Sequence, residues 1–522
     1  MTAPSPPPTI AFRERAALVA ILAVAALVRL WRLDLMEFKG DEAMACRLAL
    51  TVVDHLRGAA PAGQPFPLVG LLSSVGVPNP PLFIYLLALP LALWRDPLAA
   101  AGAIALSNVA AVGLCYLIGR RYFSPFVALA SAALYALAPW AVIFSRKIWA
   151  QDLLPVFLAG FLLAAHAFLV ERRPRALAWL LLLAAAAMQL HLSALILAGV
   201  LAGLLLAGRA TLRARWLGLG AAAALALGAP YLLHLVRTHG GDFAHLGAWR
   251  NESARLVAAD QRMDWALRFP LSVSGADETD ALVGTQASWV WPFALATGLT
   301  AFGGLLWLCW RDRRSPLFSA RLMLAAWFVL PTLGLIATGA VPIMHYFIVL
   351  YPLVFLGLAA ALEAGLRWRP AAAWTLLAAC LAGYAWLDAG LYRAVAARGG
   401  APADYGAAYA EKAAAVDFVL QDSAAYADKT AGPDLTLAAG ARQRPFLTDV
   451  AHPDNLPPEY RFLLEARSGG RPSAEAGGVM QLPRYFLLDS LRFSLTPAGQ
   501  TGTKNLRRRQ FGPLTIFVLP PS

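Results

Sequence analysis

Charged residues are scarce in this chain. Asp, Glu, Lys and Arg make up 14% of its 522 residues, against roughly 25% in an ordinary globular protein. Hydrophobic residues make up 59%, and mean hydropathy is +0.58. This balance excludes a soluble protein and predicts an integral membrane protein. The net charge of +13 would suit a nucleic-acid-binding protein, but the arginines cluster in short loops between apolar runs, so we expect no nucleic-acid partner.

Cysteine is also scarce, with four in the whole chain. Cys115 and Cys380 fall inside apolar runs, Cys309 falls at the end of one, and Cys46 alone is clearly outside. This spacing excludes a disulfide framework. Carboxylates are sparse too, and the chain has no dense carboxylate cluster beyond Asp41-Glu42. We therefore expect no required cofactor, although a divalent metal remains possible.

The apolar runs predict an all-α polytopic membrane protein with about eleven transmembrane helices. If the N-terminus is cytoplasmic, every short inward loop is basic, as the positive-inside rule requires. The first run is followed by Arg29 and Arg32 and lacks a convincing cleavage site, so we expect a retained span rather than a signal peptide. The short run 81–94 is expected to lie in the interface. The predicted spans are 14–33, 98–118, 126–144, 153–170, 176–190, 193–208, 216–236, 289–309, 321–340, 346–364 and 372–391.

Three segments are then predicted to lie outside the membrane on the far side. Residues 34–97 form the first outer loop. Residues 237–288 form the second, whose amphipathic part 250–268 is either a plain interfacial helix or a lid over the site. Residues 396–522 follow the membrane domain (1–395) and predict a small soluble α/β domain. Its expected elements are a helix over 407–420 and strands over 435–439, 484–488 and 514–519, and the run Arg507-Arg508-Arg509 is expected to be a solvated face or a lipid-headgroup contact.

Asp41 and Glu42, just beyond the first span, form the most informative motif. Carboxylates at the mouth of a membrane helix are costly to keep near hydrocarbon, which makes them candidates for chemistry or ion handling. The alternative is a helix-capping role for one or both.

A second exception is the basic pair Arg146-Lys147, which falls in a short outward turn although other short basic loops face inward. Phosphate binding would explain it, because Arg offers a planar fork of donors and Lys a point charge. Pairing with Asp152 or with lipid headgroups is the alternative. His191 and His345-Tyr346, each at an outward span end, are either cavity residues or ordinary interfacial residues.

Together these features resemble a known family. A first span, Gly40-Asp41-Glu42-Ala43 in the first outer loop, Pro80-Pro81-Leu82-Phe83-Ile84-Tyr85 opening an interfacial helix, many further spans and a polar C-terminal domain are similar to the GT-C glycosyltransferases. Within them the chain resembles glycosyltransferase family 39, the group of protein O-mannosyltransferases and bacterial aminoarabinose transferases to lipid A. It departs from the pattern at Asn79, where the family often has His or Lys, and at His345-Tyr346, where Arg-Tyr is common.

The resemblance implies an inverting transferase that moves a sugar from a polyprenyl-phosphate donor to an acceptor hydroxyl at the outer face of the cytoplasmic membrane. The acceptor would be a lipid, a glycan or a protein. Asp41 would be the general base and Glu42 a supporting carboxylate. Arg146, Lys147, His345 and Tyr346 are the candidates for binding the donor phosphate, and Asn79 and His191 for binding substrate.

Two other classes of function are considered. A lipid or solute transporter or flippase usually carries charges inside its spans, broken helices in paired positions or internal repeats. Here the middle of each span is almost pure Ala, Leu, Val and Gly, and no repeat is evident. A non-catalytic scaffold would not explain why the carboxylates Asp41-Glu42 lie at the membrane edge or why the basic pair Arg146-Lys147 lies in an outward turn.

Overall fold

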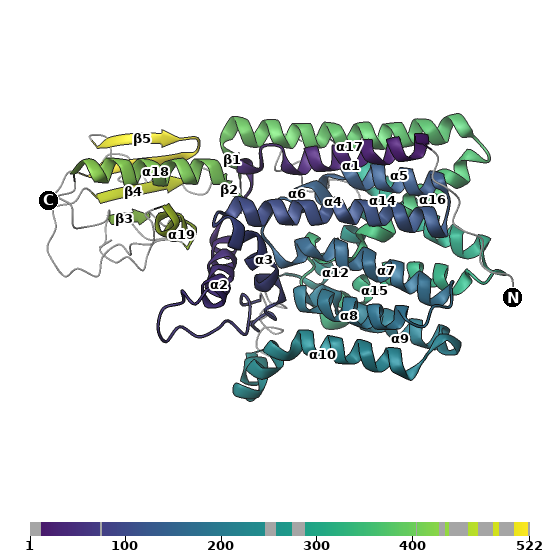
Figure 1. Cartoon of the computed structure of the whole chain (residues 1–522). Helices are drawn as coiled ribbons and strands as arrows, with labels where there is room; N and C mark the ends of the chain where they lie inside the picture. The colour runs from purple at the N-terminus through teal and green to yellow at the C-terminus, as the bar shows by residue number, and fades with distance from the viewer. Residues whose placement is uncertain are drawn as a thin grey trace.

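The structure of the chain is a computed structural model. It describes residues 12–73, 76–245, 257–273, 288–402, 405–426, 434–437, 458–467, 484–489 and 506–519. A bundle of long helices makes up most of the molecule, and a smaller unit that contains a β-sheet lies at one end of it (Figure 1).

Each predicted span coincides with helical structure, except that the span 126–144 is divided between two helices, α5 and α6, at Ala138. Among the described residues, seven helices are long and apolar enough to cross a membrane by length and composition, and the total of about eleven stays a prediction. Four shorter apolar helices accompany them. The bundle helices are α1 (Phe12–Leu30), α4 (Pro97–Tyr122), α5 (Pro125–Leu137), α6 (Pro139–Phe144), α7 (Leu154–Leu169), α8 (Ala176–Leu190), α9 (Ile196–Ala207), α10 (Ala214–Arg237), α14 (Val290–Arg311), α15 (Phe318–Thr338), α16 (Tyr351–Leu366) and α17 (Pro370–Arg398).

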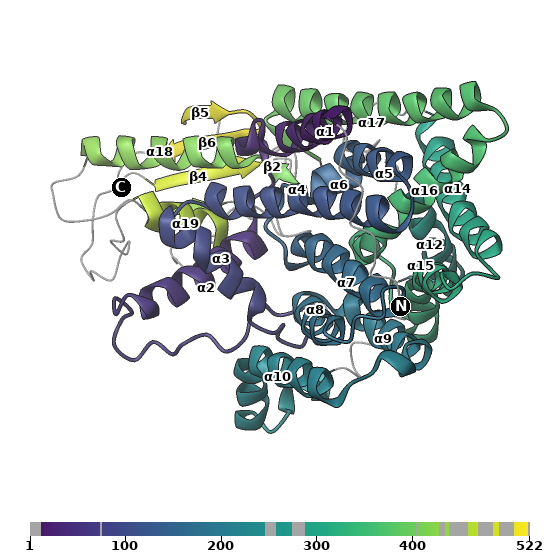
Figure 2. The same cartoon turned by 45° about the vertical axis from the view of Figure 1, so that its right-hand side comes forward.

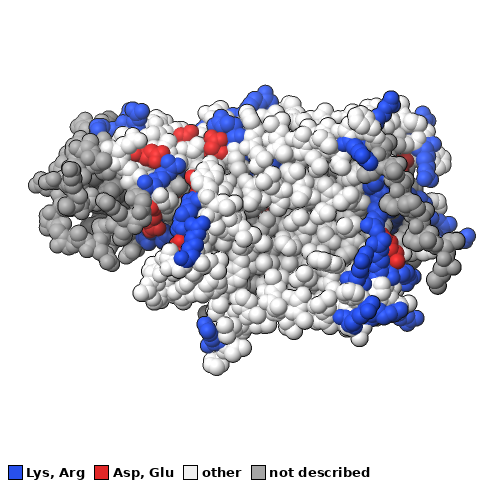
Figure 3. Space-filling view, viewed as in Figure 1, with Lys and Arg blue, Asp and Glu red and all other residues white. Residues whose placement is uncertain are grey.

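Charge is distributed as a membrane protein requires. On the face drawn in Figure 3, Lys, Arg, Asp and Glu gather toward the two ends of the molecule, and the broad zone between them is almost free of charge. Hydrocarbon would surround that zone, since a charged side chain there is costly. The chain is therefore a multi-pass membrane protein.

Small residues allow close packing between helices. A Cβ on Gly304 of α14 would lie 2.0 Å from the carbonyl oxygen of Gly357 on α16, and a Cβ on Gly357 would lie 2.4 Å from that of Ala301. Backbones that approach this closely gain van der Waals contact, which is the main source of helix association in lipid.

The structure describes only some residues of the second outer loop, 237–288. Residues 246–256 and 274–287 lie outside the described residues, which includes 250–256 of the predicted amphipathic stretch. The rest forms α12 (Ala259–Ser272), whose Arg262 donates to the carbonyl of Gly339 at 3.0 Å and whose Ala266 carbonyl accepts from Thr332 of α15 at 3.1 Å. These bonds anchor α12 on α15.

The first outer loop carries two further helices, α2 (Gly40–Leu56) and α3 (Leu82–Leu93), which follow the 3-10 turn η1 (Leu33–Leu35). The helix α3 matches the short helix predicted over 81–94. Both helices lie at the same end of the bundle as the C-terminal unit, as both views show (Figures 1 and 2).

The C-terminal unit has the α/β character expected from its sequence. Its sheet has the order β3-β4-β6-β5, in which β3 and β4 are parallel and the other neighbours antiparallel. The predicted helix and three strands are present; α19 and β5, which carries Arg507-Arg508-Arg509, are additional. The elements are α18 (Tyr409–Tyr426), β3 (Asp434–Leu437), α19 (Pro458–Arg467), β4 (Arg484–Asp489), β5 (Arg507–Phe511) and β6 (Leu514–Leu519).

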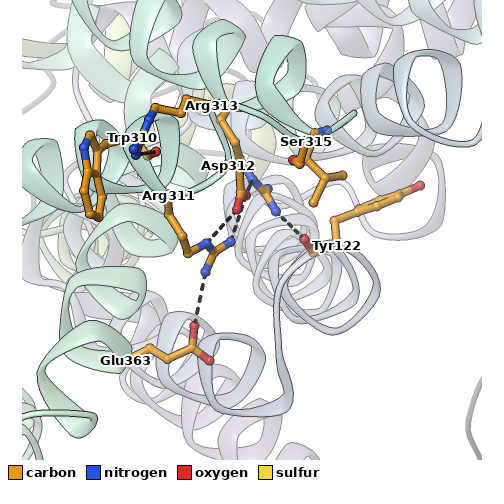
Figure 4. Close-up of polar contacts among 9 residues, drawn as sticks. Tyr122, Trp310, Arg311, Asp312, Arg313, Ser315 and Glu363 are labelled. Atoms are coloured by element: carbon orange, nitrogen blue, oxygen red, sulfur yellow. Dashed lines mark hydrogen bonds and ion pairs between the residues drawn. The ribbon is translucent and has the colours of Figure 1, made fainter.

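At the opposite end of the bundle a charge network joins four helices. The carboxylate of Asp312 forms ion pairs with the guanidinium groups of Arg311 at 2.7 Å and of the buried Arg321 at 2.9 Å. Arg321 also donates to the carbonyl of Tyr122 at 2.7 Å, and Arg311 lies 3.9 Å from Glu363 (Figure 4). Because every charge in this group has an opposite partner, the network fastens α4, α14, α15 and α16 together.

Candidate active site

The acidic pair opens α2. Lys39 is the N-cap residue of this helix, and its backbone N–H donates to Oε2 of Glu42 at 3.1 Å. A carboxylate in the first turn of a helix satisfies a free N–H group and complements the helix dipole. This bond turns Glu42 toward the protein. Asp41, one position earlier and about 100° away around the helix, is exposed.

The two carboxylates therefore have different environments. Glu42 is fully buried, whereas Asp41 faces outward. Burial, followed by the nearby Glu37 carboxylate, raises the pKa of Glu42 to about 7, with Lys147 and Lys39 opposing the rise. The division into a functional carboxylate, Asp41, and a supporting one, Glu42, stays a prediction.

Glu37 is the central residue that the sequence reasoning missed. Its carboxylate is 2% exposed and lies between two ammonium groups, with Nζ of Lys39 at 2.5 Å and Nζ of Lys147 at 2.6 Å. Burial opposes ionisation of Glu37, yet the two lysines hold its pKa below the ordinary value. The charged residues of Glu37-Phe38-Lys39 were the only local signal in the sequence. They do not identify Glu37 as the centre of the site, because its second partner, Lys147, belongs to a turn far away in the sequence.

Lys147 contacts Trp149, the first of a series of aromatic and imidazole rings in mutual contact. Its Nζ is 3.9 Å from the ring centroid of Trp149, and that of Lys39 is 5.3 Å from the same ring. The Trp149 ring meets His345 edge-on at 5.4 Å between centroids. The rings of His191, His345 and Tyr346 then contact one another at 4.7 to 5.7 Å.

Asp152 lies beside this group without pairing with Lys147. Its Oδ2 accepts from the backbone N–H of Trp149 at 3.2 Å, which shapes the turn before α7, and its Oδ1 is buried without a hydrogen bond. The alternative in which Lys147 pairs with Asp152 is therefore replaced by the pair with Glu37.

The guanidinium of Arg146 binds main-chain carbonyls. One terminal nitrogen donates to the carbonyls of Arg29 at 2.9 Å and Trp31 at 2.7 Å, and the other donates to the carbonyl of Arg32. These carbonyls belong to the end of α1 and the residues after it, where carbonyls lose their α-helical partners. Arg146 thus caps α1, and its guanidinium also stacks on the ring of Tyr392 at 4.8 Å.

His191 is held in a defined orientation. Its Nδ1 accepts from the backbone N–H of Ser193 at 3.2 Å and lies 2.8 Å from the Ser193 hydroxyl. With Nδ1 as acceptor, a neutral ring carries its proton on Nε2. That N–H is then left as a donor on the side of the ring away from Ser193.

Asn79 stands apart from the others. Its backbone N–H donates to the carbonyl of Leu71 at 2.8 Å and its carbonyl accepts from Gly70 at 2.7 Å, which closes a small loop before α3. In the described part of the chain no hydrogen bond or ring contact joins Asn79 to the remaining predicted residues. The structure therefore brings together Glu42, Lys147, His191, His345 and Tyr346 with the unexpected Glu37, Lys39 and Trp149.

Known proteins resemble this chain in part of its sequence and in its fold. A family model described as dolichyl-phosphate-mannose-protein mannosyltransferase matches residues 78–234, from the loop before α3 to α10. No curated protein sequence matches. The acidic pair and the C-terminal unit lie outside the matched segment.

Two solved structures align with this chain over nearly its full length. ArnT from Cupriavidus metallidurans bound to undecaprenyl phosphate aligns with a TM-score of 0.55 and 15% identity, over 97% of this chain and 98% of that one. Its apo form gives 0.55 and 14% over the same shares. The archaeal oligosaccharyltransferase AglB from Archaeoglobus fulgidus, in complex with an inhibitory peptide and a dolichol-phosphate, aligns with a TM-score of 0.47 and 13% identity. That alignment covers 87% of this chain and 63% of AglB. The predicted GT-C resemblance is confirmed by the ArnT match at the level of the fold.

Proposed function

We propose that this protein is an inverting glycosyltransferase that moves a sugar from a polyprenyl-phosphate donor to an acceptor hydroxyl. The observation that carries the proposal is the buried Lys39-Glu37-Lys147 arrangement beside the opening of α2, with one exposed and one buried carboxylate on that helix. The match to the mannosyltransferase family model and the fold shared with ArnT, which was solved with undecaprenyl phosphate, support the choice of donor.

The reaction assigns a distinct task to each carboxylate. Asp41 takes the proton of the acceptor hydroxyl while that oxygen attacks the anomeric carbon from the side opposite the phosphate. The bond from the anomeric carbon to the phosphate oxygen breaks, and its electron pair leaves with polyprenyl phosphate. A positioned base of this kind contributes about 10²- to 10⁴-fold in rate.

Glu42 supports Asp41 by position. Its carboxylate accepts from the backbone N–H of Lys39 and so closes the first turn of α2, which presents Asp41. An ionised carboxylate accepts such a bond more strongly than a protonated one.

The leaving phosphate gains negative charge as the bond breaks, so it requires cations more than it requires an acid. Lys147 and Lys39 supply them, and His345 and Tyr346 are proposed to complete the phosphate site. Arg146 was expected to bind phosphate directly; its contacts favour a role in holding the turn that presents Lys147. His191, through Nε2–H, and Asn79 are proposed as groups that bind substrate.

No metal is proposed to take part. In the described residues no group of three or more His, Cys, Asp and Glu side chains is arranged to hold one, and the lysines meet the charge of the phosphate. A test is to compare transfer with EDTA and with added Mg²⁺ or Mn²⁺, where equal rates support the proposal and a requirement for either metal contradicts it.

The site is proposed to face the outside of the bacterial cytoplasmic membrane, with the N-terminus in the cytoplasm and the domain 396–522 in the periplasm or outside the cell. In this orientation the polyprenyl tail stays in the bilayer while phosphate and sugar lie at headgroup level. Modification of a single cysteine placed in the C-terminal unit by a membrane-impermeant reagent tests the orientation.

The decisive experiment is sugar transfer by the purified protein from radiolabelled undecaprenyl-phosphate sugars, including mannose and aminoarabinose, to a native lipid and protein extract. Asp41→Asn should lose about 10²- to 10⁴-fold in kcat. Asp54→Asn is the matched control, because Asp54 lies on the same helix but pairs with Arg95 at 2.7 Å on the surface. Absence of transfer from every donor by folded wild-type protein would contradict the proposal and favour the transporter alternative.

A further inference from the structure

The segment that carries the acidic pair is held by the start of the C-terminal unit. Glu37 and Ala408 form an antiparallel bridge, and the backbone N–H of Tyr409 donates to the carbonyl of Met36 at 3.0 Å. The hydroxyl of Tyr405 donates to the carbonyl of Leu35. Residues 405–412, here called the docking segment, therefore run beside residues 35–38 and satisfy their backbone groups.

Lys412 binds the main chain just before the acidic pair. Its ammonium group donates to the carbonyl oxygen of Phe38, lies 3.6 Å from Oε1 of Glu459 and is 5.6 Å from the ring centroid of Tyr460. The side chain of Lys412 is 1% exposed. Burial of a cation is costly unless it is paired or hydrogen-bonded. Here the buried ammonium group is hydrogen-bonded to the main-chain oxygen of Phe38.

Phe38 is fixed through its side chain as well. Its ring is fully buried and meets Tyr409 edge-on at 5.5 Å and Phe462 at 5.9 Å. The next residue, Lys39, is the N-cap of α2 and donates to Glu42. The carbonyl of Phe38 thus belongs to the peptide unit that leads directly into the N-cap.

We propose that Lys412 is a positioning residue for the transfer reaction: through the carbonyl of Phe38 it sets the start of α2 and so the placement of Asp41 and Glu42. This inference rests on the proposed function. It gives the C-terminal unit a task in catalysis, because Lys412, Tyr409, Glu459 and Phe462 all come from that unit. Misplacement of a reacting group by about 1 Å can cost on the order of 10²-fold in rate.

The test uses the full-length protein in detergent with lipid. Lys412→Met removes the ammonium group and keeps most of the side-chain volume. Arg47→Gln is the control, because it breaks the exposed ion pair of Arg47 with Glu465 at 2.8 Å, another contact between α2 and α19, without reaching Phe38. We expect Lys412→Met to lower kcat at least ~10-fold and to change the donor KM less, since Lys147 belongs to a separate turn and only Lys39 follows the peptide unit that Lys412 binds. Arg47→Gln should keep kcat within about twofold.

A second readout does not depend on activity. Amide hydrogen exchange over residues 38–43 should accelerate in Lys412→Met and stay unchanged in Arg47→Gln. Wild-type kcat together with wild-type protection in Lys412→Met would overturn the proposal. It would also be overturned if kcat and donor binding fell only in proportion to the fraction of protein that failed to fold. If the wild type transfers no sugar, the proposed function fails, and unchanged exchange at 38–43 would then separately overturn the positioning role.

Discussion

Nζ of Lys147 lies 2.6 Å from Oε2 of Glu37, and Lys39 contacts the other oxygen of the same carboxylate. Two cations sharing Glu37 leave a surplus of one positive charge while the neighbouring Glu42 is protonated, below about pH 7. A polyprenyl-phosphate sugar is a phosphodiester with one negative charge, so donor binding would neutralise this surplus. Transfer then leaves a phosphomonoester with more negative charge, which the same cations would stabilise as it develops.

Substitution of Lys147 should therefore weaken donor binding and slow transfer together. Lys147→Met is expected to raise the donor KM about tenfold or more and to reduce kcat, because a charge-assisted contact is worth roughly 1.5–3 kcal/mol. The Kd for undecaprenyl phosphate, measured by tryptophan fluorescence or calorimetry, checks the binding part.

Lys147→Arg is the control for this prediction, since it keeps the charge but alters its geometry. It should retain more binding than Lys147→Met. Equal affinity for undecaprenyl phosphate in wild type and Lys147→Met would remove Lys147 from the phosphate site.

Arg146, although adjacent, should behave differently. Arg146→Met removes the guanidinium donor from the carbonyls of Arg29, Trp31 and Arg32, of which that of Arg32 still accepts from the backbone N–H of Leu35, and the expected cost is about 2–4 kcal/mol of stability. Thermal unfolding in detergent should show a lower Tm, while undecaprenyl-phosphate binding by the protein that stays folded should be close to wild type.

Arg393→Met is a suitable comparison for Arg146, because Arg393 is exposed and donates to the carbonyl of Ala389 in its own helix. Its Tm should change little. A loss of phosphate binding in Arg146→Met at an unchanged Tm would restore the direct role expected from the sequence.

The pH dependence of transfer should report Glu42. Because the pKa of Glu42 is raised to about 7, the group is protonated below that pH and ionised above it. We expect kcat to rise with pH through about 7, because ionised Glu42 accepts more strongly from the backbone N–H of Lys39 and so holds the first turn of α2, which carries Asp41, more firmly. Glu42→Gln should lower the plateau rate and abolish this rise, and a variant that keeps the same pH profile would assign the titration to another group.

The network in Figure 4 should matter for stability alone. Asp312→Asn leaves the buried guanidinium of Arg321 without its anion, which is expected to cost about 3–5 kcal/mol. Glu363→Gln, which loses a longer contact of 3.9 Å with the partly exposed Arg311, should cost less than about 1 kcal/mol. Chemical or thermal unfolding separates the two, and a change in donor KM in folded Asp312→Asn would show that this end of the bundle acts on the site.

The helices were predictable because an apolar run reports a membrane helix directly. Even so, the single span predicted over 126–144 is broken into α5 and α6 at Ala138, ahead of Pro139. Proline lacks an N–H group and disfavours helical backbone in the residue before it, so this break had a local signal. Strand β5 had none, since three consecutive arginines are not typical of a strand.

The site was predictable only in part. Asp41 and Glu42 were identified by the cost of charge near hydrocarbon, and Lys147 by its exception to the loop rule. Glu37 was missed because its role depends on Lys147, which reaches it only through the folded arrangement. Arg146 was assigned from its charge, but the carbonyls that it binds belong to α1, and no local pattern in the sequence indicates that pairing.

The bond from Lys412 to Phe38 joins residues 374 positions apart, which has a consequence for biosynthesis. Synthesis on the ribosome runs from the N-terminus, so the acidic segment emerges with the first helix, and the lysine that holds it emerges only after the last helix of the bundle. Until the C-terminal unit has been exported and folded, the nascent chain would occupy the membrane without a completed start of α2. A chain that stops after α17 would then accumulate in the membrane as an inactive protein, which keeps sugar transfer from beginning before assembly is finished.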